Sequence, residues 1–233
     1  MQVTGETMPA YFAEPDGLPR GGIIVIQEIF GVSEAMRDVA NLLAGDGWLA
    51  IVPALFHRTD PHFTADYDEA GFAKGSAAAG ALDVQQIVAD LTAAHSALAE
   101  RLPAGGKVGA WGFCFGGSLA YFSATLPSVS AAASFYGGQI GKSPAPGRPA
   151  MMAMTDEIHA PLFLAFGADD ESIPPAEIET IREALVRHRR TYDLHVYPNA
   201  GHAFFRGGPH GNEASADAWT RVRAFFAANL EHS

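Results

Sequence analysis

The stretch KVGAWGFCFGGSLAY, residues 107–121, decides the fold that we predict for this chain. Residues 108–111 are apolar, as in a short strand that is buried on both faces. Residues 112–116 then fit the nucleophile-elbow pattern G-x-[Ser/Cys]-x-G, with Cys114 at its centre. A strand that turns at once into a helix needs small residues two before and two after the central one, and glycine stands at both positions. The stretch therefore predicts a strand, a sharp turn and a helix.

Cys114 has two interpretations at this point. The predicted turn would raise its thiol above the sheet, beside the first N–H groups of a helix, whose partial positive charge favours a thiolate and an oxyanion. A lone free cysteine is, however, more often a small buried hydrophobic residue. The pentapeptide alone favours neither interpretation.

The composition indicates an ordinary globular protein. With 233 residues, 48% of them hydrophobic, we expect a single α/β domain over residues 1–233. A net charge of −11 argues against binding to nucleic acid or to an anionic membrane. The single cysteine excludes an intramolecular disulfide and a cysteine zinc site.

The sequence also indicates where in the cell the protein acts. The N-terminal stretch lacks a basic and apolar signal segment, and no apolar run is long enough to span a bilayer. We therefore expect a soluble cytoplasmic protein.

Apolar runs and helical periodicities alternate along the chain. Strands are expected at residues 11–13, 22–26, 48–52, 108–111, 131–136, 161–166 and 194–197, and helices near residues 33–45, 84–102, 178–185 and 218–230. This alternation predicts a mostly parallel sheet with helices on both faces.

Two segments break the alternation. Residues 54–82 are expected to wall a site rather than fill a core, and residues 141–154 to be irregular surface chain. We expect His57 and His62, in the first of these segments, to face solvent or a pocket rim, because no spaced carboxylate completes a metal site.

Chemically capable side chains follow four of the expected strands. Besides Cys114, Glu28 comes directly after residues 22–26, the pair Asp169 and Asp170 after residues 161–166, and His202 shortly after residues 194–197. Ligands of open α/β sheets bind beyond the carboxyl ends of the strands. Glu28 taken alone is equally compatible with a loop that faces water.

The order cysteine, aspartate, histidine is the triad order of the α/β-hydrolase fold. A free thiol with a pKa near ~8.5 is only slightly ionised at neutral pH, so a neighbouring imidazole must take its proton. A carboxylate on the far ring nitrogen fixes the tautomer of that imidazole. Asp170 is the preferred carboxylate because it should lie in the turn that leaves the strand, and Asp169 stays possible.

Together, several motifs resemble dienelactone hydrolases (carboxymethylenebutenolidases). These motifs are Gln27-Glu28-Ile29-Phe30-Gly31, Gly112-Phe113-Cys114-x-Gly116-Gly117, Gly167-x-x-Asp170 and Ala200-Gly201-His202-x-Phe204. The resemblance spans nearly the whole chain and implies the α/β-hydrolase fold. It also implies that Cys114, Asp170 and His202 form the triad, and that the backbone N–H groups of Ile29 and Phe115 form the oxyanion hole.

The resemblance assigns roles to Glu28 and Arg206 as well. In the family, the matching glutamate pairs with the resting thiol and moves to the matching arginine as substrate arrives, which frees a thiolate. Arg206 is also placed to bind a substrate carboxylate with two hydrogen bonds. Its alternative is a solvated surface arginine.

The resemblance also implies a second arginine, in the long segment that follows the expected strand at residues 48–52, and here the chain departs from the family. Residues 59–83 contain Lys74 but no arginine, and Arg58 is the nearest candidate. The pocket could instead be apolar, with Phe63, Tyr67 and Phe72 as contacts for another ester or lactone.

The main hypothesis is a cysteine-dependent hydrolase of a small activated ester, in particular a carboxylate-bearing enol-lactone, that works through a thioester. Under this hypothesis the protein is a monomer or small homo-oligomer that acts on a small molecule without a metal or another cofactor. Its alternatives are an esterase for a different ester or lactone, and a ligand-binding or redox-sensing protein on the same fold. A serine esterase that uses Ser118 is a poor alternative, because Ser118 lies in the helix beyond the elbow.

Overall fold

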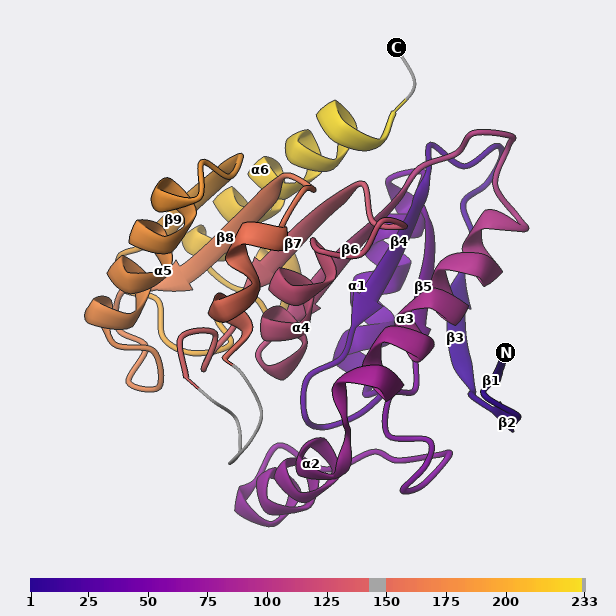
Figure 1. Ribbon diagram of the computed structural model, residues 1–233, viewed down its shortest axis with the longest axis horizontal. Helices are drawn as coiled ribbons and strands as arrows, with labels where there is room; N and C mark the ends of the chain where they lie inside the picture. Colours follow the sequence, from indigo (N-terminus) through magenta and orange to yellow (C-terminus); the bar gives the residue numbers. More distant parts are fainter. Residues whose placement is uncertain (143–149, 232–233) are drawn as a thin grey trace.

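The computed structural model describes residues 1–142 and 150–231, and its centre is a seven-stranded sheet. The strand order is β3-β5-β4-β6-β7-β8-β9, and every neighbouring pair is parallel except β3 and β5 (Figure 1). The strands are β3 (Ala10–Ala13), β4 (Gly22–Ile26), β5 (Leu49–Pro53), β6 (Val108–Phe113), β7 (Ala131–Phe135), β8 (Leu162–Gly167) and β9 (Tyr192–Tyr197). A short hairpin, β1 (Gln2–Val3) and β2 (Glu6–Thr7), precedes the sheet.

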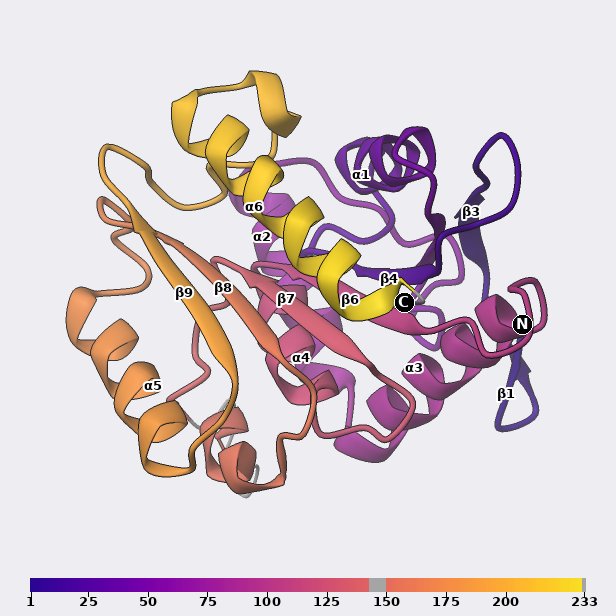
Figure 2. The ribbon, with the colours of Figure 1, turned by 90° about the horizontal axis from the view of Figure 1, so that it is seen from above.

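Helices cover both faces of this sheet. Two of them, α1 (Glu34–Gly45) and α6 (Glu213–Leu230), lie on one face (Figure 2). Three others, α3 (Val84–Ala99), α4 (Phe115–Ser123) and α5 (Pro175–Arg187), lie on the opposite face. Two short 3-10 helices, η1 (Met151–Glu157) and η2 (Gly208–His210), complete the described elements. In the described part of the chain, no helix combines the length and apolar character needed to cross a bilayer.

The central strands are buried because helices cover them on both sides. All residues of β4, β5, β6, β7 and β8 are buried, which explains their continuous apolar runs. Trp111 of β6 is fully buried against α6. Its ring stacks on that of Trp219 and contacts that of Phe226, with 5.9 and 6.2 Å between the ring centroids. The core thus fixes β6, and with it the elbow, in the middle of the sheet.

The predicted mostly parallel sheet with helices on both faces is confirmed, and the structure adds a helix and a 3-10 helix that the sequence did not predict. Within residues 54–82, the structure has a further helix, α2 (Glu69–Ala81), capped by the side chain of Asp68, which accepts from Gly71 N–H at 2.7 Å. This helix is rich in Ala and Gly and has no apolar stripe, so periodicity gives no signal for it. Part of the segment expected to be irregular, residues 141–154, is the start of η1, and residues 143–149 lie outside the described residues.

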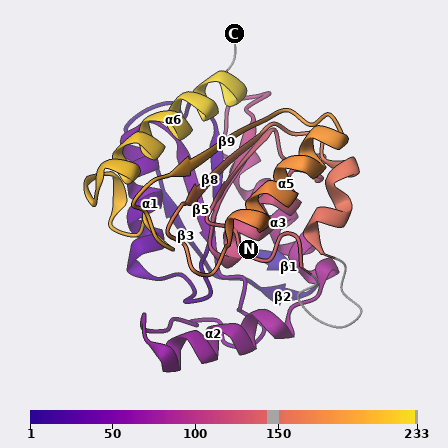
Figure 3. The same ribbon diagram turned by 90° about the vertical axis from the view of Figure 1, so that its left-hand side faces the viewer.

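Helix α2 lies apart from both helix layers (Figure 3). Its residue Gly75 packs on the carbonyl group of Ile29, in the loop that follows β4. The helix therefore sits beyond the carboxyl end of the sheet, where the candidate site lies.

Candidate active site

The turn between β6 and α4 has the geometry of a nucleophile elbow. Cys114 has φ 53° and ψ −116°, a conformation that costs free energy in a residue other than glycine. A Cβ atom on Gly112 would lie 1.8 Å from the carbonyl oxygen of Gly116, and one on Gly116 would lie 2.2 Å from that of Ile26. Only glycine fits at these two positions, so the three backbone segments hold the strained turn in place.

The structure brings together the three side chains that the sequence placed at separate strand ends. Nε2 of His202 lies 3.2 Å from Sγ of Cys114, and Nδ1 of the same ring lies 2.7 Å from Oδ2 of Asp170. A thiol, an imidazole and a carboxylate in this chain of contacts can pass the thiol proton to the imidazole and stabilise the resulting imidazolium.

Asp170, and not Asp169, contacts the histidine. Asp170 is buried, and its Oδ1 accepts hydrogen bonds from Ser172 N–H at 2.8 Å and Ile173 N–H at 3.2 Å. These two bonds leave Oδ2 for His202, whereas Asp169 is exposed. Of the two adjacent aspartates, Asp170 is therefore the one in contact with the imidazole.

The environment of His202 favours its protonated form. Burial disfavours the charge, but the hydrogen bonds to Asp170 and Cys114 and the charges of these groups outweigh it and raise the pKa of His202 to about 10. The ring also contacts the edge of the Tyr136 ring at 5.3 Å, which restricts its movement. An imidazolium held beside a sulfur atom stabilises a thiolate.

The raised pKa of His202 predicts that the protein loses stability at alkaline pH. The folded protein keeps this proton up to about pH 10, whereas the unfolded chain loses it near pH 6.5. Because His202 binds a proton in the folded state but not in the unfolded chain between these values, its contribution to the free energy of unfolding falls as the pH rises through them, by on the order of 5 kcal/mol. Urea unfolding at the two ends of this window measures the fall, and His202→Asn is expected to reduce it. An equal fall in both proteins would contradict the assignment.

Glu28 and Arg206 form an ion pair beside this triad. Nη2 of Arg206 lies 3.1 Å from Oε1 of Glu28, and Nε lies 3.3 Å from Oε2. The Glu28 side chain is fully buried, so Glu28 does not face water as a loop glutamate would. Burial disfavours the charge of Arg206, but Glu28 outweighs it and raises the pKa of the guanidinium. The resemblance implies that Glu28 contacts either the resting thiol or Arg206, and in this structure it contacts Arg206.

Of the three expected aromatic contacts, the structure brings Tyr67 to the Glu28–Arg206 pair, whereas the Phe63 ring packs on that of Phe56 with 5.1 Å between ring centroids. The ring of Tyr67 lies 4.1 Å from the Arg206 guanidinium and 4.4 Å from the Phe30 ring, and its hydroxyl lies 2.9 Å from that of Ser33. Phe72, on α2, is 56% exposed, and no described contact joins it to the site. Tyr67 therefore covers the ion pair, whereas Phe72 stays a prediction without a described contact.

Arg58 does not supply the second arginine. Its Nη1 and Nη2 lie 2.8 and 2.9 Å from the two carboxylate oxygens of buried Asp90 on α3, and its Nε lies 3.3 Å from Glu6. This bidentate pair occupies the guanidinium in a structural contact. The expectation for His57 is wrong, because its ring is buried beside Asp90, and this burial lowers the pKa of the imidazole. His62 is exposed, as expected. Over residues 1–142 and 150–231, no group of three or more His, Cys, Asp or Glu side chains could hold a metal ion.

The two expected oxyanion donors lie at the start of α4 and in the loop after β4. Phe115 is the first residue of α4, where a backbone N–H has no partner within its own helix. Among the described hydrogen bonds, the N–H of Ile29 has no acceptor either. Ser118, by contrast, donates its hydroxyl hydrogen to the carbonyl oxygen of Gly138, which argues against its use as a nucleophile.

Sequence reasoning did not single out Tyr136 as part of the site. The residue is fully buried directly after β7, has φ 40°, and packs on His202. Burial raises the pKa of its hydroxyl well above the usual value, and the charge of Glu28 adds to this. Its position at the carboxyl end of an expected strand is the signal that could have identified it.

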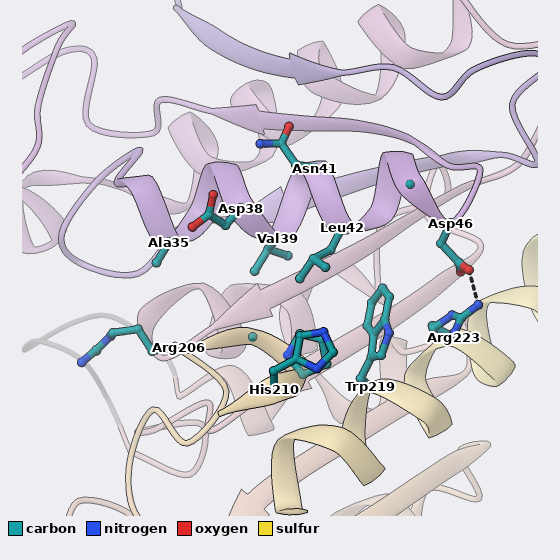
Figure 4. Close-up of a pocket in the computed structure, with 14 residues that line it drawn as sticks. Ala35, Asp38, Val39, Asn41, Leu42, Asp46, Arg206, His210, Trp219 and Arg223 are labelled. Carbon is teal, nitrogen blue, oxygen red and sulfur yellow. Dashed lines mark hydrogen bonds and ion pairs between the residues drawn. The ribbon is translucent and has the colours of Figure 1, made fainter. Parts of the chain in front are cut away.

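A separate groove of about 680 Å³ lies between α1 and α6 (Figure 4). Val39 and Leu42 of α1 line one wall, and Trp219 of α6 lines the other. Arg206 lies at one end of this groove, but its side chain points away from it (Figure 4). None of the triad residues lines this groove, and Arg206 is the residue that the groove shares with the candidate active site.

The fold and this geometry define an α/β-hydrolase. The family model "Dienelactone hydrolase family" matches residues 8–230. A relative from Synechocystis sp., provisionally named a carboxymethylenebutenolidase, is 39% identical over 95% of this chain and 92% of its own length. A similarly named relative from Escherichia coli (strain K12) is 34% identical over 95% of this chain and 83% of its own length.

A solved structure from Klebsiella pneumoniae, provisionally described as a dienelactone hydrolase, superposes with a TM-score of 0.86. It is 35% identical and covers 97% of this chain and 95% of its own. The chain therefore belongs to the dienelactone hydrolase family of ester hydrolases.

Proposed function

We propose that this protein hydrolyses a small activated ester through a thioester on Cys114, and that its substrate is a carboxylate-bearing enol-lactone. The observation that carries the proposal is the contact of the Cys114 sulfur with His202, which in turn contacts Asp170. Arg206 beside this triad supports a substrate with a carboxylate, because a guanidinium binds that group with two parallel hydrogen bonds.

In the proposed reaction, the thiolate attacks the lactone carbonyl carbon and forms a C–S bond. The carbonyl oxygen becomes an oxyanion that accepts hydrogen bonds from the N–H groups of Ile29 and Phe115. The ring C–O bond then breaks, and the resonance-stabilised enolate that leaves takes the proton from the His202 imidazolium. The resulting enol stays attached to the acyl chain, and His202 is again a neutral base. His202 next takes a proton from water, the resulting hydroxide attacks the thioester carbon, and the C–S bond breaks to regenerate the thiolate.

Rapid acid quench followed by mass spectrometry tests the thioester. Because the leaving oxygen of a lactone remains in the same molecule, the peptide that contains Cys114 is expected to gain the full mass of the lactone during turnover. Hydrolysis without such an adduct on Cys114 at any quench time, also with a slowly hydrolysed lactone, would contradict the thioester.

The role proposed for Arg206 predicts a substrate-dependent effect of removing it. Because Arg206→Met alone leaves a buried charge on Glu28, the double variant Glu28→Gln/Arg206→Met removes both charges. KM for a lactone carboxylate is expected to rise by roughly 10- to 100-fold, the value of a charge-assisted pair. KM for the methyl ester of the same lactone is expected to stay within about twofold. An equal change in both KM values would contradict the assignment.

A second candidate, an esterase for a neutral ester or lactone, follows from the contacts of Arg58. The Arg58 guanidinium is paired with Asp90, and residues 59–83 contain no arginine. A substrate carboxylate would therefore have to bind Arg206 without help from a second arginine in this segment, whereas a neutral substrate needs neither. A higher kcat/KM for neutral aryl esters than for the lactone carboxylate would favour this candidate. Alkylation of Cys114 by iodoacetamide without turnover of any ester would favour a binding or redox function.

A further inference from the structure

The peptide group between Glu28 and Ile29 is held through its carbonyl oxygen. That oxygen accepts a hydrogen bond from Gly31 N–H at 3.2 Å and one from Nε2 of Gln27 at 3.4 Å. The N–H of a trans peptide points opposite to its carbonyl. Fixing the Glu28 carbonyl therefore also fixes the direction of the Ile29 N–H.

Gln27 connects this peptide to the next strand along the sheet. Its side chain is fully buried, and its Oε1 accepts a hydrogen bond from Leu55 N–H at 3.1 Å, just after β5. The elbow packs on the same backbone, because a Cβ atom on Gly116 would lie 2.5 Å from the carbonyl oxygen of Gln27. The loop after β4 and the turn that carries Cys114 are therefore in direct contact.

Helix α2 holds the next carbonyl group, that of Ile29. A Cβ atom on Gly75 would lie 2.1 Å from the Ile29 carbonyl oxygen, 2.8 Å from its carbonyl carbon and 3.0 Å from its Cβ. Only the hydrogen of a glycine fits at this contact. On the same helix, a Cβ atom on Gly80 would have no atom within 4 Å, so Gly80 provides a matched comparison.

We propose that Gly75 is a positioning residue for catalysis: it lets α2 pack on Ile29 and hold that residue's N–H toward the oxyanion. The proposal rests on the proposed function, in which Ile29 N–H is one of two oxyanion donors. Such a donor must lie about 2.7–3.1 Å from the oxyanion, and loss of one costs roughly 10²- to 10³-fold in kcat. A side chain at position 75 would displace the Ile29 carbonyl and with it this donor.

Two variants of the same helix test the proposal. Gly75→Ala is expected to lower kcat for ester hydrolysis by about 10- to 100-fold with little change in KM, because it misplaces one oxyanion donor. Gly80→Ala is expected to retain wild-type kcat. Alkylation of Cys114 by iodoacetamide displaces iodide from a saturated carbon and needs no oxyanion hole, so its rate is expected to match wild type in both variants.

Two results would overturn the role of Gly75. One is a kcat within about twofold of wild type in folded Gly75→Ala. The other is an equal loss of kcat and alkylation rate, which would indicate a disturbed nucleophile instead. Should Gly75→Ala fail to fold, Gln27→Met acts from the other side of the peptide, by removing the bond to the Glu28 carbonyl. Gln27→Met is also expected to lower kcat while the rate of Cys114 alkylation stays at the wild-type value. A wild-type kcat in this variant would equally contradict the proposal.

The same assays separate this proposal from the proposed function. Wild-type protein that is alkylated at Cys114 but hydrolyses no ester would contradict the function itself. Wild-type hydrolysis together with unimpaired Gly75→Ala contradicts only the role of Gly75.

Discussion

Cys114→Ala is expected to lower kcat/KM for every ester that the protein hydrolyses by about 10⁴-fold or more. The sulfur is the group that would form the covalent intermediate, and the loss of a nucleophile from a triad leaves only binding and the oxyanion hole. Steady-state hydrolysis of a lactone and of a neutral aryl ester measures the loss. Cysteine and alanine are strained alike by the φ of 53° at this position. We therefore expect the variant to fold with little change in its free energy of unfolding.

Cys114→Ser is the matched control for the shape of the site. It keeps a hydroxyl at the same place but replaces a soft, readily ionised group by one that ionises far less easily. We expect it to retain a small part of the wild-type rate. Full activity of Cys114→Ala toward any of these esters would show that another group attacks the carbonyl carbon.

Asp170→Asn is expected to lower kcat by about 10³- to 10⁴-fold. The asparagine can still accept the hydrogen bonds from Ser172 and Ile173, so the turn should persist. Its amide would face Nδ1 of His202 and favour the wrong tautomer, which cannot take a proton from the thiol. The pH dependence of Cys114 alkylation measures this change together with kcat, because it follows the formation of the thiolate.

Asp169→Asn provides the control for that variant. It makes the same chemical change at the adjacent, exposed position, and we expect kcat to stay within about twofold of wild type. A larger loss in Asp169→Asn than in Asp170→Asn would reverse the assignment of the carboxylate.

The sequence was sufficient to predict the residues at strand ends, because the order of strands and helices determines where they meet. Cys114, Asp170 and His202 follow three parallel strands whose carboxyl ends share one edge of the sheet. The choice between Asp169 and Asp170 followed from the direction of a single turn. The pairing of Glu28 with Arg206 could be anticipated only from the family resemblance, since 178 residues separate the two.

Other features depend on packing that no local pattern records. Helix α2 buries Gly71, Gly75 and Ala78, which carry too little apolar surface to give a periodic signal. His57 was expected to face solvent or a pocket rim because no spaced carboxylate completes a metal site, but it is buried beside Asp90, which also pairs with Arg58. Phe72 stays a prediction, because its side chain on α2 is exposed and no described contact joins it to the site.

The position of the triad on the sheet has a consequence for partly unfolded molecules. Cys114 follows a fully buried central strand, whereas His202 follows β9, the last strand in the sheet order and one that is only partly covered. Fraying of this outer strand would separate the imidazole from the sulfur while the middle of the sheet stays intact. The thiol would then lose its proton acceptor well before the whole protein unfolds. A partly unfolded molecule would therefore carry a poorly reactive thiol and would not modify other compounds indiscriminately.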